Sequence, residues 1–470
     1  MKKVLLLQPP VSFKEKAFAL VPNCPHLGLL YLAASLIREG FNVRYCDISD
    51  NSLSVSEVKS LIEDDDISIL CITAMTQNIK GAVQLARFLK EKGVGIKIIL
   101  GGPHVSADPT LIERFPYFDV AITGESELTL PKVVKDIFSG KPIKGVIKGE
   151  TPLDLNDLPF PARHIVDHDI YFRRGLSANG IFATRGCPYH CNFCSIPAID
   201  KRVRFRSPKL IADEMKECYA LTGVKKFNFS DDALTIDKNF VYSLCDEIQK
   251  LPFSALWEAQ SRINYVDRPL LRVMRKAGCR KLLFGIESGN ERIRNQIIGK
   301  NVTDEQIANS TKLCWDEKIE PDHYLMMGQP TETKNEILDT INCSLRFKPN
   351  IIGIFITMPL PGSPLFLQAI EEGVIEEEVI DKFIRGDYGQ GYQGSWPYYV
   401  PKGLTQNELI GYRNLAYRKF YFRPEYILRR IGQDCTSLVK LKRDLREGLS
   451  LFIKNRPADD FNIKKSEMIN

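Results

Sequence analysis

The segment Arg185-Gly186-Cys187-Pro188-Tyr189-His190-Cys191-Asn192-Phe193-Cys194 places three cysteines within a short CxxxCxxC spacing, directly after the apolar run 180–184. Three thiolates this close in sequence can hold one metal centre. A [4Fe–4S] cluster is normally held by four cysteine thiolates, so three of them leave one iron with an open coordination position. The spacing therefore predicts a cluster with a vacancy for a second molecule.

Zinc is the competing interpretation of these cysteines. A structural zinc site uses four ligands, usually in paired spacings, and no second cysteine pair lies nearby. His190 is a candidate for the fourth ligand, but it abuts Cys191 and would strain a tetrahedral shell. Three buried cysteines that hold no metal are the remaining alternative.

Length and composition indicate a soluble globular protein of several units. The 470 residues are 44% hydrophobic and 26% charged, which suits roughly three units with sizeable cores. We find no apolar run of membrane-spanning length, and the apolar start of the chain ends at Gln8, too early for a signal peptide. Twelve mostly isolated cysteines favour a reducing compartment, so we expect a cytoplasmic protein. A net charge of +6 is mild, and we expect no nucleic-acid partner.

Residues 1–140 alternate between strand and helix patterns. The predicted strands are Val4–Leu7, Asn42–Asp47, Ile67–Thr73, Ile96–Leu100 and Asp119–Thr123. The predicted helices are Leu27–Arg38, Val55–Glu63, Ile79–Lys90 and Leu128–Ile137. This rhythm predicts an α/β fold with a doubly wound parallel sheet, which binds ligands at the carboxyl ends of its strands.

A second strand-helix series follows a linker. Residues 141–178 are rich in proline and in turn-forming Asp and Asn, and we predict no helix or strand there. Residues 179–370 then carry six predicted strands, which imply a partial (β/α)6 barrel, and residues 371–470 are predicted as a helical C-terminal region. The six strands are Ile181–Thr184, Lys226–Phe229, Leu256–Gln260, Lys281–Ile286, His323–Met327 and Ile351–Met358. Polar residues follow several of these strands, which is typical of a catalytic mouth.

The CxxxCxxC spacing, with Phe193 before its last cysteine, resembles the cluster motif of radical S-adenosylmethionine (SAM) enzymes. The resemblance implies that Cys187, Cys191 and Cys194 hold a [4Fe–4S] cluster and that its open iron binds SAM. One electron, from a reductant such as flavodoxin or ferredoxin, then cleaves SAM to a 5′-deoxyadenosyl radical in this family. Phe193 belongs to the implied cofactor site.

The strand ends of the second series match the same family in order. Ser230 and Asp231 stand where the family binds the methionine amino group of SAM, although Gly-Gly-Glu is more usual there. Arg262 is suited to pair with the methionine carboxylate, because a guanidinium can bind both oxygens. Glu287 and Ser288 resemble the family segment near the ribose hydroxyls. For each residue alone, a surface ion pair or helix cap is the alternative.

The first series is similar to cobalamin-binding domains. Its strand ends match at Thr73, Met75, Gly101 and Gly102, and glycines there would let the backbone approach a corrin closely. The Asp-x-His-x-x-Gly that supplies an axial histidine is missing, so the resemblance implies cobalamin with no histidine ligand from that loop. No dinucleotide or nucleoside triphosphate motif is present.

Two further features of the first series have open interpretations. His104 is close enough in sequence to Gly102 to approach the corrin, or it bonds its own backbone. Gly124 and Glu125 begin a GE-x-E run found in cobalamin-type radical enzymes, or they mark a helix N-terminus.

The resemblance implies a cobalamin-dependent radical SAM enzyme, similar to the class B methyltransferases, that methylates an unactivated carbon of a small-molecule or lipid-like metabolite. Relatives with the same domains also close rings or rearrange carbon skeletons. A radical methylthiotransferase or RNA-modifying enzyme without cobalamin, and a non-enzymatic redox sensor, are the other hypotheses.

The C-terminal region adds two expectations. An aromatic, glycine-rich loop at 387–399 is a candidate cover for the barrel mouth, or it lines an ordinary domain contact. The basic segments Leu409–Arg423 and Tyr426–Arg446 are either solvated helix faces or sites of membrane association.

Overall fold

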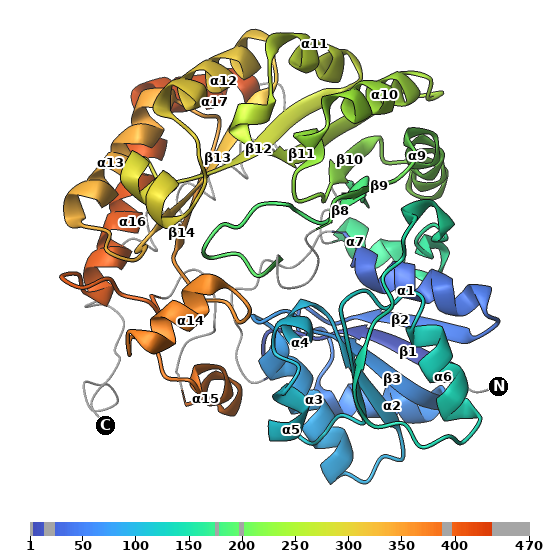
Figure 1. The fold of residues 1–470 in the computed structure, drawn as a ribbon. Coiled ribbons are helices and arrows are strands. Elements are labelled where there is room, and N and C mark those ends of the chain that lie inside the picture. The colour runs from blue at the N-terminus through green and yellow to red at the C-terminus, as the bar shows by residue number, and fades with distance from the viewer. Residues whose placement is uncertain (1–2, 14–23, 174–177, 197–201, 388–396, 435–470) are drawn as a thin grey trace.

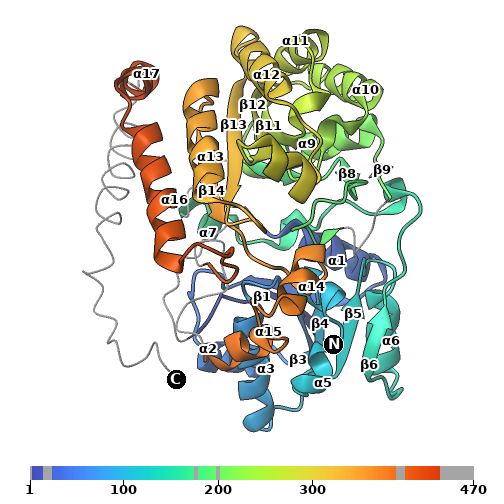
Figure 2. The same ribbon diagram turned by 60° about the vertical axis from the view of Figure 1, so that its left-hand side comes forward.

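A computed structural model describes residues 3–13, 24–173, 178–196, 202–387 and 397–434. Figure 1 shows two strand-helix units, with the N-terminal unit in blue and the second unit as an arc of strands covered on its outer side by helices. Figure 2 shows the C-terminal helices alongside both units. In the described part of the chain, we find no helix that is long and apolar enough to cross a membrane.

The first unit is a parallel sheet of six strands with helices on both faces. In spatial order its strands are β2 (Asn42–Asp47), β1 (Lys3–Gln8), β3 (Ile67–Thr73), β4 (Lys97–Gly101), β5 (Val120–Thr123) and β6 (Gly145–Lys148). Its helices are α1 (Leu27–Arg38), α2 (Val55–Asp64), α3 (Ile79–Glu91), α4 (Pro103–Ala107), α5 (Leu111–Arg114) and α6 (Leu130–Phe138). This confirms the predicted doubly wound sheet.

The sequence explains why both faces are covered. The strand β1 is an apolar run in which Val4 and Leu6 pack with α1 and α6, while Leu5 and Leu7 pack with α2 and α3. Burial on both faces is typical of parallel strands. The helix α2 begins at a capping box, in which the Ser54 hydroxyl accepts from the N–H of Glu57.

The predicted linker contains regular structure that the sequence analysis did not predict. Within 141–178, β6 pairs in parallel with β5 and extends the first sheet. The helix α7 (His168–Arg173) and the short 3-10 helices η1 (Leu155–Asp157) and η2 (Arg163–Ile165) follow. The strand is only four residues long and lies at the sheet edge, so its local pattern is weak and the neighbouring strand supplies the decisive hydrogen bonds.

The second unit is also a parallel six-stranded sheet, which confirms the predicted partial barrel. In spatial order its strands are β14 (Ile352–Ile356), β13 (Glu320–Met327), β12 (Cys279–Glu287), β11 (Leu256–Ser261), β10 (Lys226–Phe229) and β7 (Asn179–Ile181). Its helical segments are α9 (Pro208–Thr222), η3 (Leu234–Ile236), α10 (Lys238–Gln249), η4 (Ile263–Tyr265), α11 (Arg268–Lys276), η5 (Arg292–Ile297), α12 (Asp304–Asp316) and α13 (Lys334–Phe347).

The first strand of this unit differs from its predicted range of Ile181–Thr184. The strand β7 ends at Ile181, and Thr184 and Arg185 instead form β8 (Thr184–Arg185), which pairs antiparallel with β9 (Arg204–Phe205). The two short strands bracket the segment 186–203. The three cysteines therefore lie on a loop that is closed at its base by a two-stranded sheet.

The C-terminal region contacts both units. The helices α14 (Pro364–Glu371) and α15 (Val379–Arg385) pack with the core of the first sheet, together with the buried Tyr398 and Tyr399. Those two tyrosines end the predicted aromatic loop, of which residues 388–396 lie outside the described residues. The basic residues Lys440, Lys442, Arg443 and Arg446 lie outside them as well.

The helix α16 (Gln406–Tyr421) covers the outer edge of the second sheet, and α17 (Pro424–Asp434) follows it. The hydroxyl of Tyr417 accepts from the N–H of Ile354 at 2.9 Å and donates to its carbonyl at 3.2 Å. Tyr421 makes the same pair of bonds with Ile352, at 3.2 and 2.9 Å. Two tyrosines thus satisfy backbone groups on the free edge of β14 that another strand would otherwise pair.

Candidate functional site

The cysteine loop is fixed by hydrogen bonds from three separate parts of the second unit and its C-terminal extension. The N–H of Asn192 donates to the carbonyl of Ile298 at 3.2 Å, and the Asn192 carbonyl accepts from the N–H of Leu365 at 2.9 Å. The Asn192 side chain donates to Oε1 of Gln329, a buried residue two positions after β13, at 3.2 Å. A residue between two of the cysteines therefore positions the loop.

The thiols lie in partly dehydrated surroundings. Cys191 is buried, and Cys187 and Cys194 are half-buried. Burial raises the pKa of the Cys194 thiol to about 11 and also raises the pKa of Cys187. Over the described ranges, no three His, Cys, Asp or Glu side chains converge closely enough to form a metal site as they stand.

The buried carboxylate of Asp231 holds the base of the cysteine loop through hydrogen bonds. Its carboxylate is 1% exposed and accepts from the N–H groups of Ala183 and Thr184 and from the Thr184 hydroxyl, the last at 2.7 Å. Burial raises the pKa of this carboxyl to about 7, although these hydrogen bonds favour its ionised form. Ser230, predicted beside it, donates its N–H to the carbonyl of Ile181. The Asp231 oxygens are therefore engaged by the protein itself.

Asp232 is the second carboxylate of the Ser-Asp-Asp segment, and the sequence analysis did not select it as a contact. Its side chain is accessible to solvent but surrounded by protein atoms, and the resulting loss of hydration raises its pKa. It acts electrostatically on the thiols of Cys187 and Cys194 and raises their pKa values, so it lies on the same side as the cysteine loop. No local sequence pattern indicates which of the two adjacent carboxylates, Asp231 or Asp232, points into the protein.

Arg262, at the end of β11, stacks on the cysteine loop. Its guanidinium carbon lies 3.7 Å from the centre of the Tyr189 ring, and one terminal nitrogen donates to the carbonyl of Lys300. The side chain is buried, and its Nε has no hydrogen-bond partner among the described residues. A buried donor without a partner is costly, which indicates a place for an external acceptor.

The end of β12 combines a strained backbone conformation with an ion pair. Glu287 has a backbone φ of +68°, an uncommon conformation for a residue other than glycine, and accepts from Nζ of Lys300 at 2.8 Å. A Cβ on Gly285 would lie 2.3 Å from the Glu287 carboxylate, so the glycine makes room for this pair. Ser288 is fully buried, and its hydroxyl bonds Thr340 and the N–H of Asn290. Backbone strain of this kind tends to occur at functional sites.

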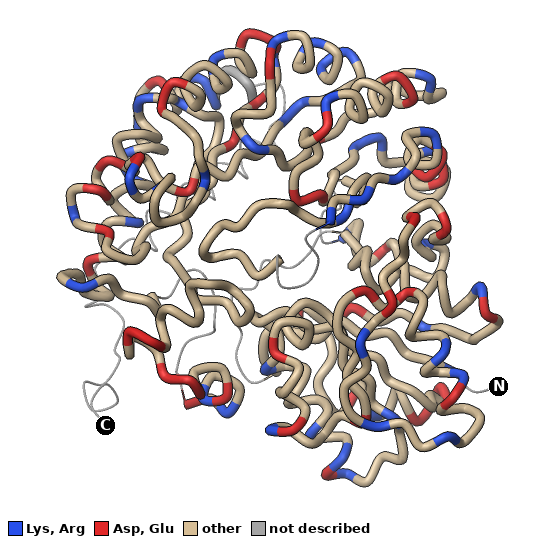
Figure 3. The backbone as a smooth tube through the Cα atoms, viewed as in Figure 1, with Lys and Arg blue, Asp and Glu red and all other residues tan. Residues whose placement is uncertain are grey.

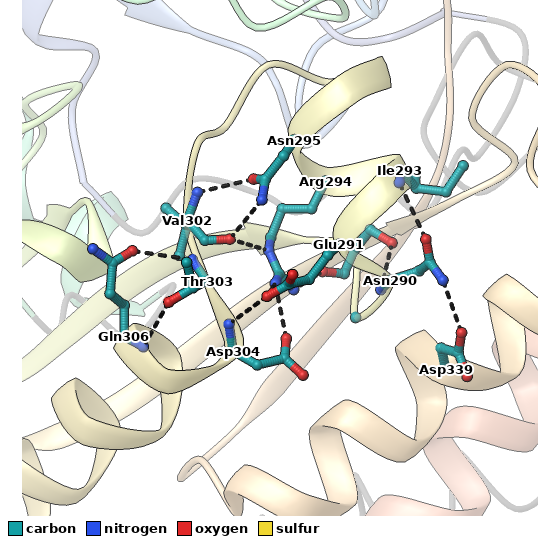
Figure 4. Close-up of polar contacts among 12 residues, drawn as sticks. Asn290, Glu291, Ile293, Arg294, Asn295, Val302, Thr303, Asp304, Gln306 and Asp339 are labelled. Carbon is teal, nitrogen blue, oxygen red and sulfur yellow. Dashed lines mark hydrogen bonds and ion pairs between the residues drawn. The ribbon is translucent and has the colours of Figure 1, made fainter.

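A polar network fixes the segment between these residues and the cysteine loop (Figure 4). Arg294, fully buried in the π-helical segment η5, donates to the carbonyls of Ser288 and Val302 and pairs with Asp304 at 2.8 Å. The network positions Ile298, which both accepts from Asn192 and packs against Cys191. The π-helical turn was not predicted from the sequence, although such turns are frequent at functional sites.

The carboxyl ends of β3 and β4 border a cavity in the first unit. Thr73, Gly101 and Gly102 line it, and the other lining residues are Leu29, Leu32, Cys71, Ile72, Ile99, Ile122, Ser126 and Leu130. Gly102 has a φ of +103°, and a Cβ there would lie within 2.8 Å of the backbone of Ala74. No side chain larger than hydrogen fits at this point.

Met75 and His104 occupy different surroundings at the same edge. Met75 is 40% exposed, which is unusual for a methionine at the end of a buried strand. His104 lies in α4 and is 1% exposed, with Nδ1 3.0 Å from the hydroxyl of Thr76. Burial lowers the pKa of His104 to about 4, so its ring is neutral. Its contact is with a side chain of the neighbouring loop.

Gly124 and Glu125 do not start a helix, because α6 begins only at Leu130. The N–H of Gly124 donates to the hydroxyl of Ser106 within the first unit at 2.8 Å, whereas Glu125 connects the two units. The carboxylate of Glu125 binds the guanidinium groups of Arg185 and Arg204, and Glu127 binds Arg185 at 2.7 Å. Arg185 precedes the cysteines and Arg204 follows them. We call this set of four residues the interdomain ion cluster, and it attaches both ends of the cysteine loop to the edge of the first sheet.

These observations fit the cofactors that the sequence suggested. The cysteine loop offers three thiols as donors, the unpartnered Nε of Arg262 and the accessible carboxylate of Asp232 lie beside it, and the first sheet provides a cavity bordered by Gly102. Thiolates are the usual protein ligands of iron–sulfur clusters. The fit is one of chemistry and placement, and cluster assembly would have to draw the three thiols together.

Comparison with known proteins finds a family match for each of the two units. A family model described as "B12 binding domain" matches residues 19–134, and one described as "Radical SAM superfamily" matches residues 181–343. An uncharacterized methyltransferase of Pyrococcus horikoshii is 28% identical, with 93% of this chain and 96% of that protein covered. The anaerobic magnesium-protoporphyrin IX monomethyl ester cyclase of Rubrivivax gelatinosus is 24% identical, with 90% and 78% covered.

Among solved structures, the radical SAM methyltransferase TsrM from Kitasatospora setae, with cobalamin and a [4Fe–4S] cluster bound, has a TM-score of 0.64 at 18% identity. The similarity covers 79% of this chain and 78% of that one and shows that the fold is shared. With one match for each of its two sheets, the chain combines a B12-binding domain with a radical SAM domain.

Proposed function

We propose that this enzyme transfers a methyl group to an unactivated carbon of a small molecule, using a [4Fe–4S] cluster, SAM and cobalamin. In this proposal Cys187, Cys191 and Cys194 hold the cluster, and the cavity bordered by Thr73, Gly101 and Gly102 holds part of the cobalamin. When bound, the cluster and SAM supply a radical that removes a hydrogen atom, and cobalamin supplies the methyl group. A flavodoxin or ferredoxin is the proposed electron donor.

The proposal depends on one observation above the others, which is that the cysteine loop lies between the carboxyl edges of the two sheets. Phe193 packs against the core of the first sheet and also against Ile293 and Ile298 of the second unit. The interdomain ion cluster joins the same two edges. A cluster on this loop and a cofactor on the first sheet would therefore face a common space.

The protein's own side chains have distinct proposed tasks. Arg262 binds the methionine carboxylate of SAM, because its unpartnered Nε needs an acceptor. Asp232 binds the methionine amino group, since the Asp231 carboxylate is engaged in positioning the loop. Glu287 and Lys300 lie at the neighbouring strand end, where the ribose of SAM is expected. Phe193 and Ile298 exclude water from the cysteine loop.

Ring closure is the second candidate function, because one similar protein is a cyclase. Both reactions would begin with removal of a hydrogen atom, and they differ in whether the product gains a methyl group. A small-molecule substrate suits both. Figure 3 shows lysines and arginines interspersed with aspartates and glutamates over both units, a distribution unlike the continuous basic surface of many nucleic-acid-binding proteins.

The test is cofactor analysis of the full chain, purified and reconstituted without oxygen. We expect about four irons per chain, cobalamin that stays bound through gel filtration with the spectrum of the base-off form, and 5′-deoxyadenosine after reduction with dithionite and SAM. Retained iron without cobalamin would refute the cobalamin part of the proposal. Absence of 5′-deoxyadenosine from a protein with a full iron content would refute the radical part.

A further inference from the structure

The inner face of the second sheet is distinct from its outer face. Along each strand, alternate side chains such as Trp257 and Phe284 pack outward against α9 to α13. Figure 1 shows these helices on the outer side of the arc of strands and the cysteine loop on its inner side. The side chains between them point inward. We call this inward surface, formed by Asn228, Gln260, Leu283, Tyr324, Gly353 and Phe355, the inner face.

The inner face exposes apolar rings that a packed barrel would bury. Phe355 is 45% exposed, and Tyr324 and Leu283 are half-buried. The rings of Tyr324 and Phe355 have their centres 6.0 Å apart and are tilted by 49°. Interior positions of barrels are normally filled by side chains, so exposed rings at these positions indicate a surface that another molecule covers.

A glycine makes room for this aromatic pair. Gly353 is the cross-strand partner of Tyr324 on β14, and a Cβ there would lie 2.5 Å from the Tyr324 ring. On the other side, Gly285 is the cross-strand partner of Tyr324 on β12, and the space above it is taken by the Glu287 carboxylate and the Lys300 ammonium group. The Tyr324 ring therefore depends on Gly353 for its position.

Charged side chains also lie on the inner face, where they are paired with one another. Glu258 is the cross-strand partner of Asn228, and Asp322 is that of Leu283. Lys281 lies 3.4 Å from Asp322 and 3.9 Å from Glu258, and Lys226 lies 3.6 Å from the same Glu258. Lys300 pairs with Glu287. Each of these three lysines already faces a carboxylate, which disfavours a phosphorylated substrate.

We propose that the substrate presents a planar, apolar ring system that rests on Tyr324, Phe355 and Leu283, with the side of the ring that reacts turned toward the cysteine loop. This inference depends on the proposed function, because it takes the space between the inner face and the loop as the reaction space. A tetrapyrrole and a single indole ring share the required chemistry and differ in size.

Equilibrium dialysis against the anaerobically reconstituted full-length enzyme, with cobalamin already bound, tests the proposal. The planar probes are protoporphyrin IX and indole, and cytidine 5′-monophosphate is the phosphorylated probe. We expect saturable binding of at least one planar probe that is tighter than that of the nucleotide. Tighter binding of the porphyrin would assign a tetrapyrrole-sized substrate, and tighter binding of indole a smaller one.

Variants locate the binding surface. Phe355→Ser should weaken binding of the planar probe at least about tenfold, the loss expected when one aromatic ring leaves an apolar contact. Gly353→Ala should weaken it by pushing Tyr324 out of place. Phe172→Ser is the matched control, because Phe172 on α7 is 44% exposed outside the inner face, and it should change binding less than twofold.

Three outcomes would overturn the inference: no saturable binding of either planar probe, preferred binding of the nucleotide, or equal effects of Phe355→Ser and Phe172→Ser. Iron content, cobalamin content and 5′-deoxyadenosine formation are measured on the same preparations. A protein that passes these assays and fails the binding tests refutes the substrate class alone, and the proposed function stands.

Discussion

The two sheets have the same strand number, the same parallel direction and helices packed against them, but their carboxyl edges differ. The first edge ends in Thr73, Gly101 and Gly102 and leaves a cavity. The second ends in buried side chains that bond residues of neighbouring loops, namely Asp231, Arg262, Glu287 and Gln329. One edge leaves a small cavity bordered by glycine, and the other provides the atoms that hold the cysteine loop in position.

The largest expected effect comes from a substitution in the cysteine loop, which the second edge holds in position. Cys191→Ser should reduce the iron content from about four to below one per chain and abolish 5′-deoxyadenosine formation, because two thiols cannot retain the cluster. Iron analysis and the visible spectrum measure this. Cys46→Ser, a half-buried cysteine in β2, is the control and should keep its iron. Equal loss of iron from both variants would contradict the assignment.

The first edge is tested at Gly102, the glycine that borders its cavity. Gly102→Ala should weaken cobalamin retention at least about tenfold while the iron content stays unchanged, because the new Cβ meets the backbone of Ala74. Gly140→Ala is matched to it: Gly140 also has a positive φ, of +79°, but nothing lies within 4 Å of its Cβ position. Cobalamin bound after gel filtration is the measurement, and loss in both variants would show that backbone strain alone is responsible.

The buried carboxylate of the second edge should give stability an unusual pH dependence. The pKa of Asp231 is about 7 in the folded protein and about 4 when unfolded, so between these values the folded state holds a proton that the unfolded state has released. The free energy of unfolding should therefore fall as pH rises from about 4 to 7 and level off above. Glu332, with a pKa raised to about 7 by burial, adds to this slope.

Urea unfolding of the apo-protein at pH 5 and pH 7.5, followed by tryptophan fluorescence, measures the effect, because Trp257 and Trp315 lie in the second unit. Asp231→Asn should reduce the difference between the two pH values. Asp213→Asn is the control, because a hydrogen bond from Lys216 lowers the pKa of Asp213, so this carboxylate is ionised at both pH values and its loss should leave the difference unchanged. If Asp231→Asn kept the same difference in unfolding free energy between pH 5 and pH 7.5, the assigned pKa would be contradicted.

The smallest expected effect concerns the contact between the two edges. Glu125→Gln should lower the melting temperature by several degrees, because the arginines Arg185 and Arg204 are mostly buried and would lose a counter-charge. Glu150→Gln removes an exposed partner of Lys132 and should change the melting temperature by about one degree or less. Differential scanning calorimetry would distinguish the two, and equal shifts would mean that the interdomain ion cluster contributes little.

The sequence predicted the elements whose pattern is local and strong. The boundaries of α1, β2, β3 and β10 agree with the predicted ranges, because strand alternation and helical spacing of apolar residues are local signals. The strand β6 and the π-helical turn η5 were missed, since each depends on neighbours distant in sequence. For the same reason, no local pattern pairs Glu125 with Arg204, or directs Asp231 inward and Asp232 outward.

The α16 tyrosines that bond β14 bear on how the incomplete barrel avoids association with other chains. A closed barrel has no free edge, whereas an arc of six strands ends in an unpaired strand that invites another chain to add on. The hydroxyls of Tyr417 and Tyr421 occupy backbone groups of that strand without continuing the sheet. The arc is thereby protected against edge-to-edge association with another chain, although it remains an incomplete barrel.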